Sequence, residues 1–311
     1  MTLDPQMRNF VEQLAAAGTP PDFGAIGAQA ARAFADARGM PGKGPDIHRV
    51  SDVDIPGRNG PMAGRLYVPR PDPRCLLVYL HGGGWTLGSI AGYDPPLRHF
   101  ADRSGCALLS FEYRLAPEHR FPTAVEDCID CVRWAAANLV QLDLDAVLPV
   151  AVGGDSAGGN LSAVVALLAR DEGSPDLAAQ LLIYPATQAD FTTPSYRTHV
   201  ADLPLTARSM QWFWDQYIPD LGQRRNPLAS PLHARDLSGL PRALVVLAGY
   251  DPLLSEGEAY AERLQQADNT VTVLRYDGLT HGFFQFSELL PVAGRALEEI
   301  ADRFCELLPP S

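Results

Sequence analysis

Short apolar runs recur along the chain from residue 47 onward, each about the length of a single strand. Most of these runs are continuous, as in strands covered on both faces, whereas the first two alternate between polar and apolar positions around the turn 57–60. The first two are therefore expected to pair as a hairpin. The predicted strands are Ile47–Ile55, Ala63–Val68, Cys75–Leu80, Ala107–Phe111, Val147–Val152, Gln180–Tyr184, Ala243–Ala248 and Val271–Tyr276.

Segments in which apolar residues recur at helical spacing separate most of these strands. An alternation of strands and helices builds a mostly parallel sheet with helices on both of its faces. The pattern therefore predicts an α/β fold with a central sheet of eight strands. The predicted helices are Leu97–Ser104, Thr123–Leu139, Asn160–Arg170, Glu256–Ala267 and Val292–Leu308.

Two regions interrupt this alternation. Before the first strand, Asp4 and Pro5 form a helix-start signal, a second, alanine-rich helix is expected at about 23–38, and a linker rich in Gly and Pro follows at 39–45. A second stretch of about sixty residues, with several large aromatic side chains, precedes the seventh predicted strand. An insertion after a core strand suggests a lid over the strand ends.

Composition and charge narrow the choice of partners. The chain has 311 residues, which suits one large α/β domain with an accessory part, and its net charge is −12 at pH 7. Nucleic-acid binding needs clustered Lys and Arg, and the sequence has no such cluster. No apolar stretch approaches the ~20 residues that span a bilayer, and residues 1–20 lack the pattern of an export signal. We expect neither a nucleic-acid nor a membrane partner, while a homodimer stays open.

The cysteines favour a reducing compartment. Their number is five and their positions are scattered, which does not suggest a disulfide framework. Cys128 and Cys131 form a C-x-x-C inside a segment of helical spacing. A redox C-x-x-C lies instead at a helix N-terminus, where the helix dipole lowers the pKa of the thiol. We therefore expect structural thiols in a cytoplasmic protein.

The strongest chemical signal is the sequence G-D-S-A-G-G at residues 154–159, which directly follows a predicted strand and precedes a predicted helix. A strand that turns sharply into a helix needs small neighbours and lifts the central hydroxyl clear of the sheet. Ser156 is therefore the predicted nucleophile. The alternative is a glycine-rich turn with an incidental serine, but the motif requires both flanking elements and both are present.

A second glycine-rich motif, H-G-G-G-W at 81–85, follows the third predicted strand. Enzymes of acyl transfer stabilise an oxyanion with preorganised N–H groups, and consecutive glycines let the backbone approach the substrate. A phosphate-binding loop is disfavoured because no Lys-Ser/Thr follows the glycines. We assign the oxyanion hole to the N–H groups of three residues, Gly83, Gly84 and Ala157. The expected supports of this loop are His81, which would orient it by hydrogen bonding, Gly82 and Trp85.

Two further polar residues follow strands at the same edge of the predicted sheet. Asp251 comes after the seventh predicted strand and His281 after the eighth. The carboxyl ends of strands are where α/β sheets place their sites, and nucleophile, acid, base is the chain order that accompanies a G-x-S-x-G elbow. We therefore assign His281 as the general base and Asp251 as the group that orients it.

Together these motifs resemble the hormone-sensitive-lipase family of esterases, in its G-D-S-A-G branch. The resemblance covers the whole chain and implies the α/β-hydrolase fold, carboxylesterase activity, no metal or other cofactor, and a helical cap. It implies supporting roles for Asp155 and Glu256, and an ion pair between Arg114 and Glu118 that braces the loop. Ser255 stands where the family often has Asp, which leaves the triad untouched. Further matching residues are Y-R-L-A-P-E at 113–118, Y-P at 184–185, S-P at 230–231, D-P-L at 251–253 and H-G-F at 281–283.

The resemblance also divides the chain. Residues 1–45 are the expected N-terminal part of the cap, and residues 46–311 the α/β-hydrolase catalytic domain. Within that domain, 188–230 is the expected cap insertion.

The predicted function is hydrolysis of short- to medium-chain acyl esters through a covalent acyl-enzyme. Ser156 would attack the ester carbonyl, and His281 would take the proton and return it to the leaving alcohol. An amidase or lactonase with the same triad is the first alternative, because the fold does not decide between them. A small-molecule receptor on this scaffold, lacking the base, is disfavoured by the presence of His281. The acidic charge favours dissolved substrates over emulsified fat.

Overall fold

The computed structural model describes residues 2–18, 21–38, 42–198 and 203–309. Its sheet has eight strands in the order β1-β2-β4-β3-β5-β6-β7-β8. The pairs β1–β2 and β2–β4 are antiparallel and the other neighbours are parallel, so the predicted mostly parallel sheet of eight strands is confirmed. The strands are β1 (Arg49–Ile55), β2 (Met62–Val68), β3 (Leu76–Leu80), β4 (Ala107–Phe111), β5 (Val150–Asp155), β6 (Ala179–Ile183), β7 (Arg242–Tyr250) and β8 (Val271–Thr280).

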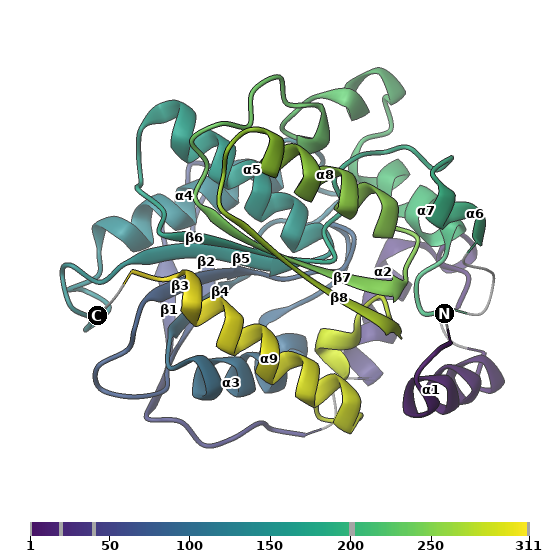
Figure 1. The fold of residues 1–311 in the computed structure, drawn as a ribbon, viewed down its shortest axis with the longest axis horizontal. Helices are drawn as coiled ribbons and strands as arrows, with labels where there is room; N and C mark the ends of the chain where they lie inside the picture. The colour runs from purple at the N-terminus through teal and green to yellow at the C-terminus, as the bar shows by residue number, and fades with distance from the viewer. Residues whose placement is uncertain (1, 19–20, 39–41, 199–202, 310–311) are drawn as a thin grey trace.

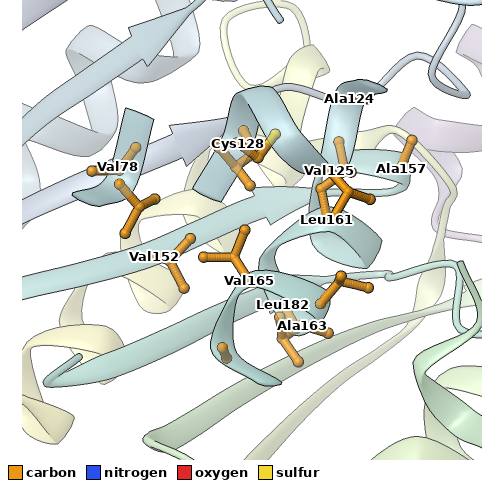
Figure 2. Packing of buried hydrophobic residues seen from close by; sticks show 14 of the residues in the cluster. Val78, Ala124, Val125, Cys128, Val152, Ala157, Leu161, Ala163, Val165 and Leu182 are labelled. Carbon is orange, nitrogen blue, oxygen red and sulfur yellow. The ribbon is translucent and has the colours of Figure 1, made fainter. Parts of the chain in front are cut away.

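Helices cover both faces of the sheet: α3 and α9 lie on one face, and α4, α5 and α8 on the other (Figure 1). The side chains of β3 alternate between the two cores. Leu76, Val78 and Leu80 pack beneath α4 and α5, in the core shown in Figure 2, whereas Leu77 and Tyr79 pack beneath α3 and α9. The helices are α1 (Pro5–Ala16), α2 (Phe23–Arg38), α3 (Ile90–Ser104), α4 (Thr123–Ala137), α5 (Ala157–Glu172), α6 (Pro194–Thr198), α7 (Ala207–Tyr217), α8 (Leu254–Gln266) and α9 (Pro291–Leu307).

The start and end of β5 differ from the predicted boundaries. The strand begins at Val150 rather than at Val147, because Pro149 has no N–H to donate to the ladder. It continues through Gly153 and Gly154, which remain paired with β6. The strand therefore ends directly at the residue before the predicted nucleophile.

Helix α3 begins at Ile90 rather than at the predicted Leu97. The hydroxyl of Ser89 caps its first turn, and Pro95 and Pro96 lie inside the helix. The two prolines interrupt the helical pattern in the sequence, which is why the first turns were not predicted. The additional turns bring a tyrosine to the site described below.

The N-terminal helices lie near the end of the sheet toward which β7 and β8 point (Figure 1). Helix α1 is capped by the Asp4 carboxylate and packs against β8 and α9 through the fully buried Met7. Helix α2 packs against α7, where the ring of Phe23 lies 5.4 Å from that of Trp212. The bounds of α2 match the prediction, but Gly27 has φ 78° and divides the helix into two parts.

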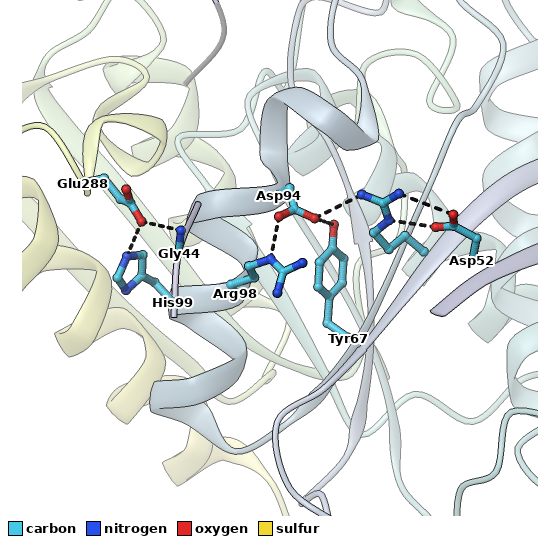
Figure 3. A network of polar contacts seen from close by, with 8 residues as sticks. Gly44, Asp52, Tyr67, Asp94, Arg98, His99 and Glu288 are labelled. Carbon is cyan, nitrogen blue, oxygen red and sulfur yellow. Dashed lines mark hydrogen bonds and ion pairs between the residues drawn. The ribbon is translucent and has the colours of Figure 1, made fainter. Parts of the chain in front are cut away.

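A polar network joins the connector that follows α2 to the body of the protein (Figure 3). The Glu288 carboxylate accepts the N–H of Gly44 and contacts the imidazole Nε2 of His99, each at 2.7 Å. Glu288 lies in the segment between the short 3₁₀ helix η3 (Phe283–Phe286) and α9. The connector is therefore tied to α3 and to the chain just beyond β8.

Candidate active site

Ser156 lies between β5 and α5 with backbone angles φ 56° and ψ −118°, in a region that non-glycine residues rarely occupy. Small neighbours are required here. A Cβ atom at Gly154 or Gly158 would lie only 2.2 or 1.8 Å from the carbonyl oxygen of Leu80. The turn therefore presses against the end of β3, next to the H-G-G-G-W loop, and presents the hydroxyl at the carboxyl edge of the sheet.

The side chains of Ser156, His281 and Asp251 form a continuous chain of hydrogen bonds. Ser156 Oγ lies 2.9 Å from His281 Nε2, and His281 Nδ1 lies 2.7 Å from Asp251 Oδ2. The other carboxylate oxygen of Asp251 accepts the N–H of Leu253 at 2.8 Å, which fixes its rotamer. Asp251 is fully buried, and Ser156 and His281 are each 8% exposed. The arrangement can pass a proton from the hydroxyl to the imidazole while the carboxylate stabilises the imidazolium.

His81 controls the direction of one peptide in the H-G-G-G-W segment at 81–85, called the glycine loop from here on. Its Nδ1 lies 2.8 Å from the carbonyl oxygen of Gly82. Burial lowers the pKa of His81 to about 4, so the imidazole is neutral at pH 7 and the proton on Nδ1 is donated to this carbonyl. The C=O of Gly82 and the N–H of Gly83 point in opposite directions across one trans peptide. Holding the carbonyl therefore aims the N–H of Gly83.

The next peptide is held in the same way. The carbonyl oxygen of Gly83 accepts the N–H groups of Thr86 and Leu87, at 3.1 and 2.8 Å, which directs the N–H of Gly84 to the opposite side. Among the described residues, no acceptor is found for the N–H of Gly83 or of Gly84. Two aimed and unoccupied donors are what an oxyanion hole requires.

The third assigned donor, the N–H of Ala157, is in the first turn of α5. The carbonyl oxygen of Ser156 accepts the N–H of Asn160 at 2.9 Å and that of Ala186 at 3.3 Å, which fixes the peptide that carries this donor. The first N–H groups of a helix have no partner within the helix, and the helix dipole there favours negative charge.

Comparisons with known proteins agree with this geometry. A family model described as alpha/beta hydrolase fold matches residues 77–285. The chain belongs to the α/β-hydrolase family, among its hormone-sensitive-lipase-type esterases. Carboxylic ester hydrolase LipN of Mycobacterium tuberculosis is 44% identical over 83% of this chain and 69% of its own length.

Two further relatives match over nearly the whole chain. Ethyl acetate hydrolase of Pseudomonas putida is 33% identical over 97% of this chain and 98% of its own. The structure of a hyperthermophilic esterase from Pyrobaculum calidifontis has a TM-score of 0.90 and 40% identity, covering 99% of each chain. The protein is thus a carboxylic ester hydrolase, and its predicted fold and family are confirmed.

Asp155 ties the two halves of the esterase site together. Its carboxylate accepts the hydroxyls of Tyr79 and Tyr93, at 3.0 and 2.9 Å, and the N–H of Gly82 at 3.0 Å. Burial raises the pKa of Asp155 to about 6, although the hydrogen bonds of the two tyrosines oppose the shift. The side chain therefore bonds β3, α3 and the glycine loop to one another. Tyr93 comes from the part of α3 that the sequence did not predict, so sequence reasoning missed it.

The remaining predicted supports lie around the esterase site without entering the hydrogen-bond chain. Trp85 is fully buried and stacks on Tyr217 at 4.5 Å, in the core rather than in a pocket. Glu256 is also buried and accepts the N–H of Thr187 at 2.7 Å, at the start of the insertion. Burial raises the pKa of Glu256 well above its usual range.

The predicted ion pair between Arg114 and Glu118 is wrong. Arg114 pairs with the buried Asp127 of α4 at 2.8 Å, and Glu118 pairs with Arg32 of α2 at 2.6 Å. Four residues along an irregular segment do not share a face as they would on a helix, so the two side chains leave in different directions. Asp127 lies close to Arg114 in the sequence, so the Arg114–Asp127 pair could have been predicted. Nothing in the sequence indicates Arg32 as the partner of Glu118.

A cavity of about 490 Å³ adjoins the glycine loop. Its wall includes Gly82 and Gly83 of the loop, Tyr93 of α3, Asp36 of α2 and Gln285 of η3. Sequence reasoning did not single out Asp36 or Gln285, which no motif marks. Of the assigned oxyanion donors Gly83 lies in this wall, whereas the triad residues do not.

Two further findings concern metals and membranes, in the residues that the structure describes. No group of three or more His, Cys, Asp and Glu side chains is arranged to hold a metal ion there. Within the same residues, none of the helices combines the length and apolar character needed to cross a bilayer. The five cysteines are free thiols, and those of the C-x-x-C are buried in α4.

Proposed function

We propose that the protein hydrolyses dissolved esters of short- to medium-chain acyl groups by a two-step acyl transfer. The observation that carries the proposal is the hydrogen-bond chain from Ser156 Oγ through His281 to the buried Asp251. A hydroxyl held 2.9 Å from an imidazole whose other nitrogen faces a carboxylate is arranged for activation as a nucleophile.

In the first step Ser156 Oγ bonds to the ester carbonyl carbon while its proton passes to His281 Nε2. The carbonyl oxygen becomes an oxyanion, which the N–H groups of Gly83, Gly84 and Ala157 stabilise. The intermediate collapses when His281 gives the proton to the leaving alcohol. Water then attacks the acyl-enzyme, His281 takes its proton and returns it to Ser156, and the carboxylic acid departs.

The acyl-length preference rests on three observations. The relative from Pseudomonas putida is named for ethyl acetate, a small dissolved ester. The cavity beside the glycine loop has a volume of about 490 Å³, and the chain carries a net charge of −12, which does not favour an anionic lipid surface. Together they support acyl chains on the order of four to eight carbons, since each buried CH₂ contributes about 0.8 kcal/mol until the cavity ends.

The proposal extends to the cap and the compartment. Residues 1–45 and 188–230 would act together as the cap, a proposal supported by the packing of Phe23 on Trp212 and Phe213. The free thiols support a reducing compartment such as the cytoplasm.

Replacement of the nucleophile tests the mechanism directly. Ser156→Ala should lower kcat for p-nitrophenyl butyrate by at least about 10⁴-fold and abolish labelling by a serine-directed phosphonate. Ser238→Ala, which changes an exposed loop serine, is the matched control and should retain wild-type kcat. Phosphonate labelling of Ser156→Ala at another serine would contradict the assignment.

A further inference from the structure

The guanidinium of Arg32 joins helix α2 to two separate segments around the glycine loop. Its Nε donates to the carbonyl oxygen of Thr86 at 2.7 Å, and its Nη2 donates to that of Ala116 at 2.6 Å. The same group pairs with the Glu118 carboxylate, at 3.0 Å from Nη1 and 2.6 Å from Nη2. The side chain is 25% exposed, so its donors lie largely among these protein acceptors.

The two segments that Arg32 joins are also bonded to each other. The N–H of Ala116 donates to the carbonyl oxygen of Trp85 at 2.8 Å. Arg32 donates to the carbonyl oxygen of Thr86, which follows Trp85 in the chain, and to the carbonyl oxygen of Ala116. Only a planar fork of several fixed donors can hold two backbone carbonyls and a carboxylate at once, and a lysine ammonium cannot reproduce that geometry.

The contact of Arg32 with Thr86 influences the peptide between Gly83 and Gly84, which carries an assigned oxyanion donor. The carbonyl of Thr86, which Arg32 holds, belongs to the same peptide as the N–H of Leu87. That N–H donates to the carbonyl of Gly83 at 2.8 Å, which directs the N–H of Gly84. The loop turn is thus fixed from the inside by its own hydrogen bonds and from the outside by α2.

A second contact from the cap region meets the same loop. A Cβ atom at Gly84 would lie 2.2 Å from the ring of Phe213, so this ring of α7 occupies the place of a side chain at Gly84. Phe213 in turn packs against Phe23 of α2, with ring centroids 5.7 Å apart. Helices α2 and α7 therefore both contact the segment 84–86.

We infer that Arg32 is a positioning residue, through which helix α2 sets the alignment of the oxyanion donors. The inference rests on the proposed function, because it takes the N–H of Gly84 as one of those donors. A misaligned donor weakens stabilisation of the transition state more than binding of the ground-state ester. Loss of Arg32 therefore lowers kcat by a similar factor for every acyl length and leaves KM nearly unchanged.

The test compares three variants with a matched control. Arg32→Met removes all of the contacts, Arg32→Lys keeps the charge beside Glu118, and Glu118→Gln removes the ion pair but leaves both carbonyl contacts. Arg208→Met is the control, because this arginine pairs with Asp22 at 2.6 Å within the same region and does not contact the loop. Each variant is assayed with p-nitrophenyl acetate and hexanoate, and for inhibition by an alkyl trifluoromethyl ketone.

The ketone reports on the oxyanion directly. Ser156 Oγ bonds to its carbonyl carbon, its proton passes to His281, and the carbonyl oxygen becomes a stable oxyanion in the hole. In Arg32→Met and Arg32→Lys, kcat should fall about 10- to 100-fold and the inhibition constant of the ketone should rise by the same factor, with KM within about twofold. Glu118→Gln and Arg208→Met should keep both values within about twofold.

Other results would overturn the inference. A folded Arg32→Met with wild-type kcat would do so, as would a fall in kcat without a matching rise in the inhibition constant of the ketone. An equal loss in Arg208→Met would indicate general loosening of the cap. Where Arg32→Met does not fold, Arg32→Lys decides, and recovery of wild-type ketone inhibition by lysine would reject the role of the fork. Turnover and phosphonate labelling of wild-type Ser156 are measured first, so that failure of the proposed function is recognised separately.

Discussion

The strand ends that carry the triad and the helices of the proposed cap are held in different ways. Each triad residue directly follows a strand, and the backbones of two of them are bonded to neighbouring strands: the N–H of Ser156 donates to Ile183, and that of His281 to Tyr250. In the segments of the proposed cap, polar contacts join residues that are far apart in the sequence. Examples are the contacts of Arg32 with Thr86, of Arg208 with Asp22, and of Gly44 with Glu288.

From this difference we expect the strand ends to determine the chemical step and the proposed cap to influence substrate selectivity. Each triad residue is attached directly to the end of a strand, whose backbone hydrogen bonds restrict its movement. The ion pairs of Arg32 and Arg208 in the proposed cap are partly exposed, and exposed ion pairs each contribute little to stability. Changes at the strand ends should therefore abolish turnover, whereas changes in the cap should alter it by degrees.

The largest expected effect is at the strand end of β7. Asp251→Asn should lower kcat about 10³- to 10⁴-fold with little change in KM, because the amide no longer holds the imidazole in the required tautomer. Steady-state kinetics with p-nitrophenyl butyrate measure it. Glu256→Gln is the matched control, since Glu256 is an equally buried carboxylate that bonds to the loop at 187–188. An Asp251→Asn enzyme within tenfold of wild type would mean that another carboxylate orients His281.

The second effect concerns the free energy of unfolding and comes from His81 in the glycine loop, which lies between the strand ends and the proposed cap. Burial lowers the pKa of His81 to about 4, below its ordinary value of 6.5. As pH falls below 6.5 the unfolded chain takes up a proton that the folded protein refuses until about pH 4, so His81 makes folding less favourable across this window. His81→Asn should therefore gain about 2 to 3 kcal/mol relative to wild type between pH 7.5 and 4.5, measured by urea unfolding.

Asp155 provides a control of opposite sign. Burial raises the pKa of Asp155 from 3.8 to about 6, so the folded protein takes up the proton first as pH falls. Its contribution to stability thus increases below pH 6, and Asp155→Asn should lose stability relative to wild type at pH 4.5. Parallel shifts in the two variants would show that neither group titrates as its burial predicts.

The third effect tests how the cap is tethered. Lys43 is the single lysine of the chain, so a lysine-specific protease cuts only in the connector between α2 and β1. Cleavage requires local opening, which the hydrogen bond from Gly44 N–H to the Glu288 carboxylate opposes. Glu288→Gln should raise the rate of this cut about tenfold, because an amide oxygen accepts more weakly than a carboxylate. Glu306→Gln, which removes an exposed pair with Arg303, should not change it.

The smallest effect is selectivity for acyl length. The ratio kcat/KM should rise by up to about fourfold per carbon, reach a maximum at about four to eight carbons and then fall. A series of p-nitrophenyl esters, kept below their aggregation limits, measures the profile. A maximum at long chains, or a jump in rate when triglyceride forms an interface, would identify a true lipase. It would also mean that the proposed cap does not limit the length of the acyl chain.

The sheet and the triad could be predicted from the sequence because their signals are local. Apolar runs marked the strands, and Ser156, Asp251 and His281 each stood a few residues after the end of one of them. The two failures have different physical causes. The partner of a polar side chain depends on packing, which no local signal records. Arg32 lies in an alanine-rich segment with no motif, and its carbonyl partners are 54 and 84 residues away. Tyr93 was missed because prolines obscured the start of α3.

The Asp155 carboxylate has a consequence for how the site responds to heat and to protein engineering. It bonds the nucleophile elbow, through its own backbone, to the N–H of Gly82 and to tyrosines of β3 and α3. Elbow and glycine loop should thus fluctuate as one rigid body, and slow breathing of the sheet should not change the spacing between nucleophile and oxyanion donors. A graft of this site onto another scaffold would need four parts together: the elbow, the loop, and the tyrosines at 79 and 93.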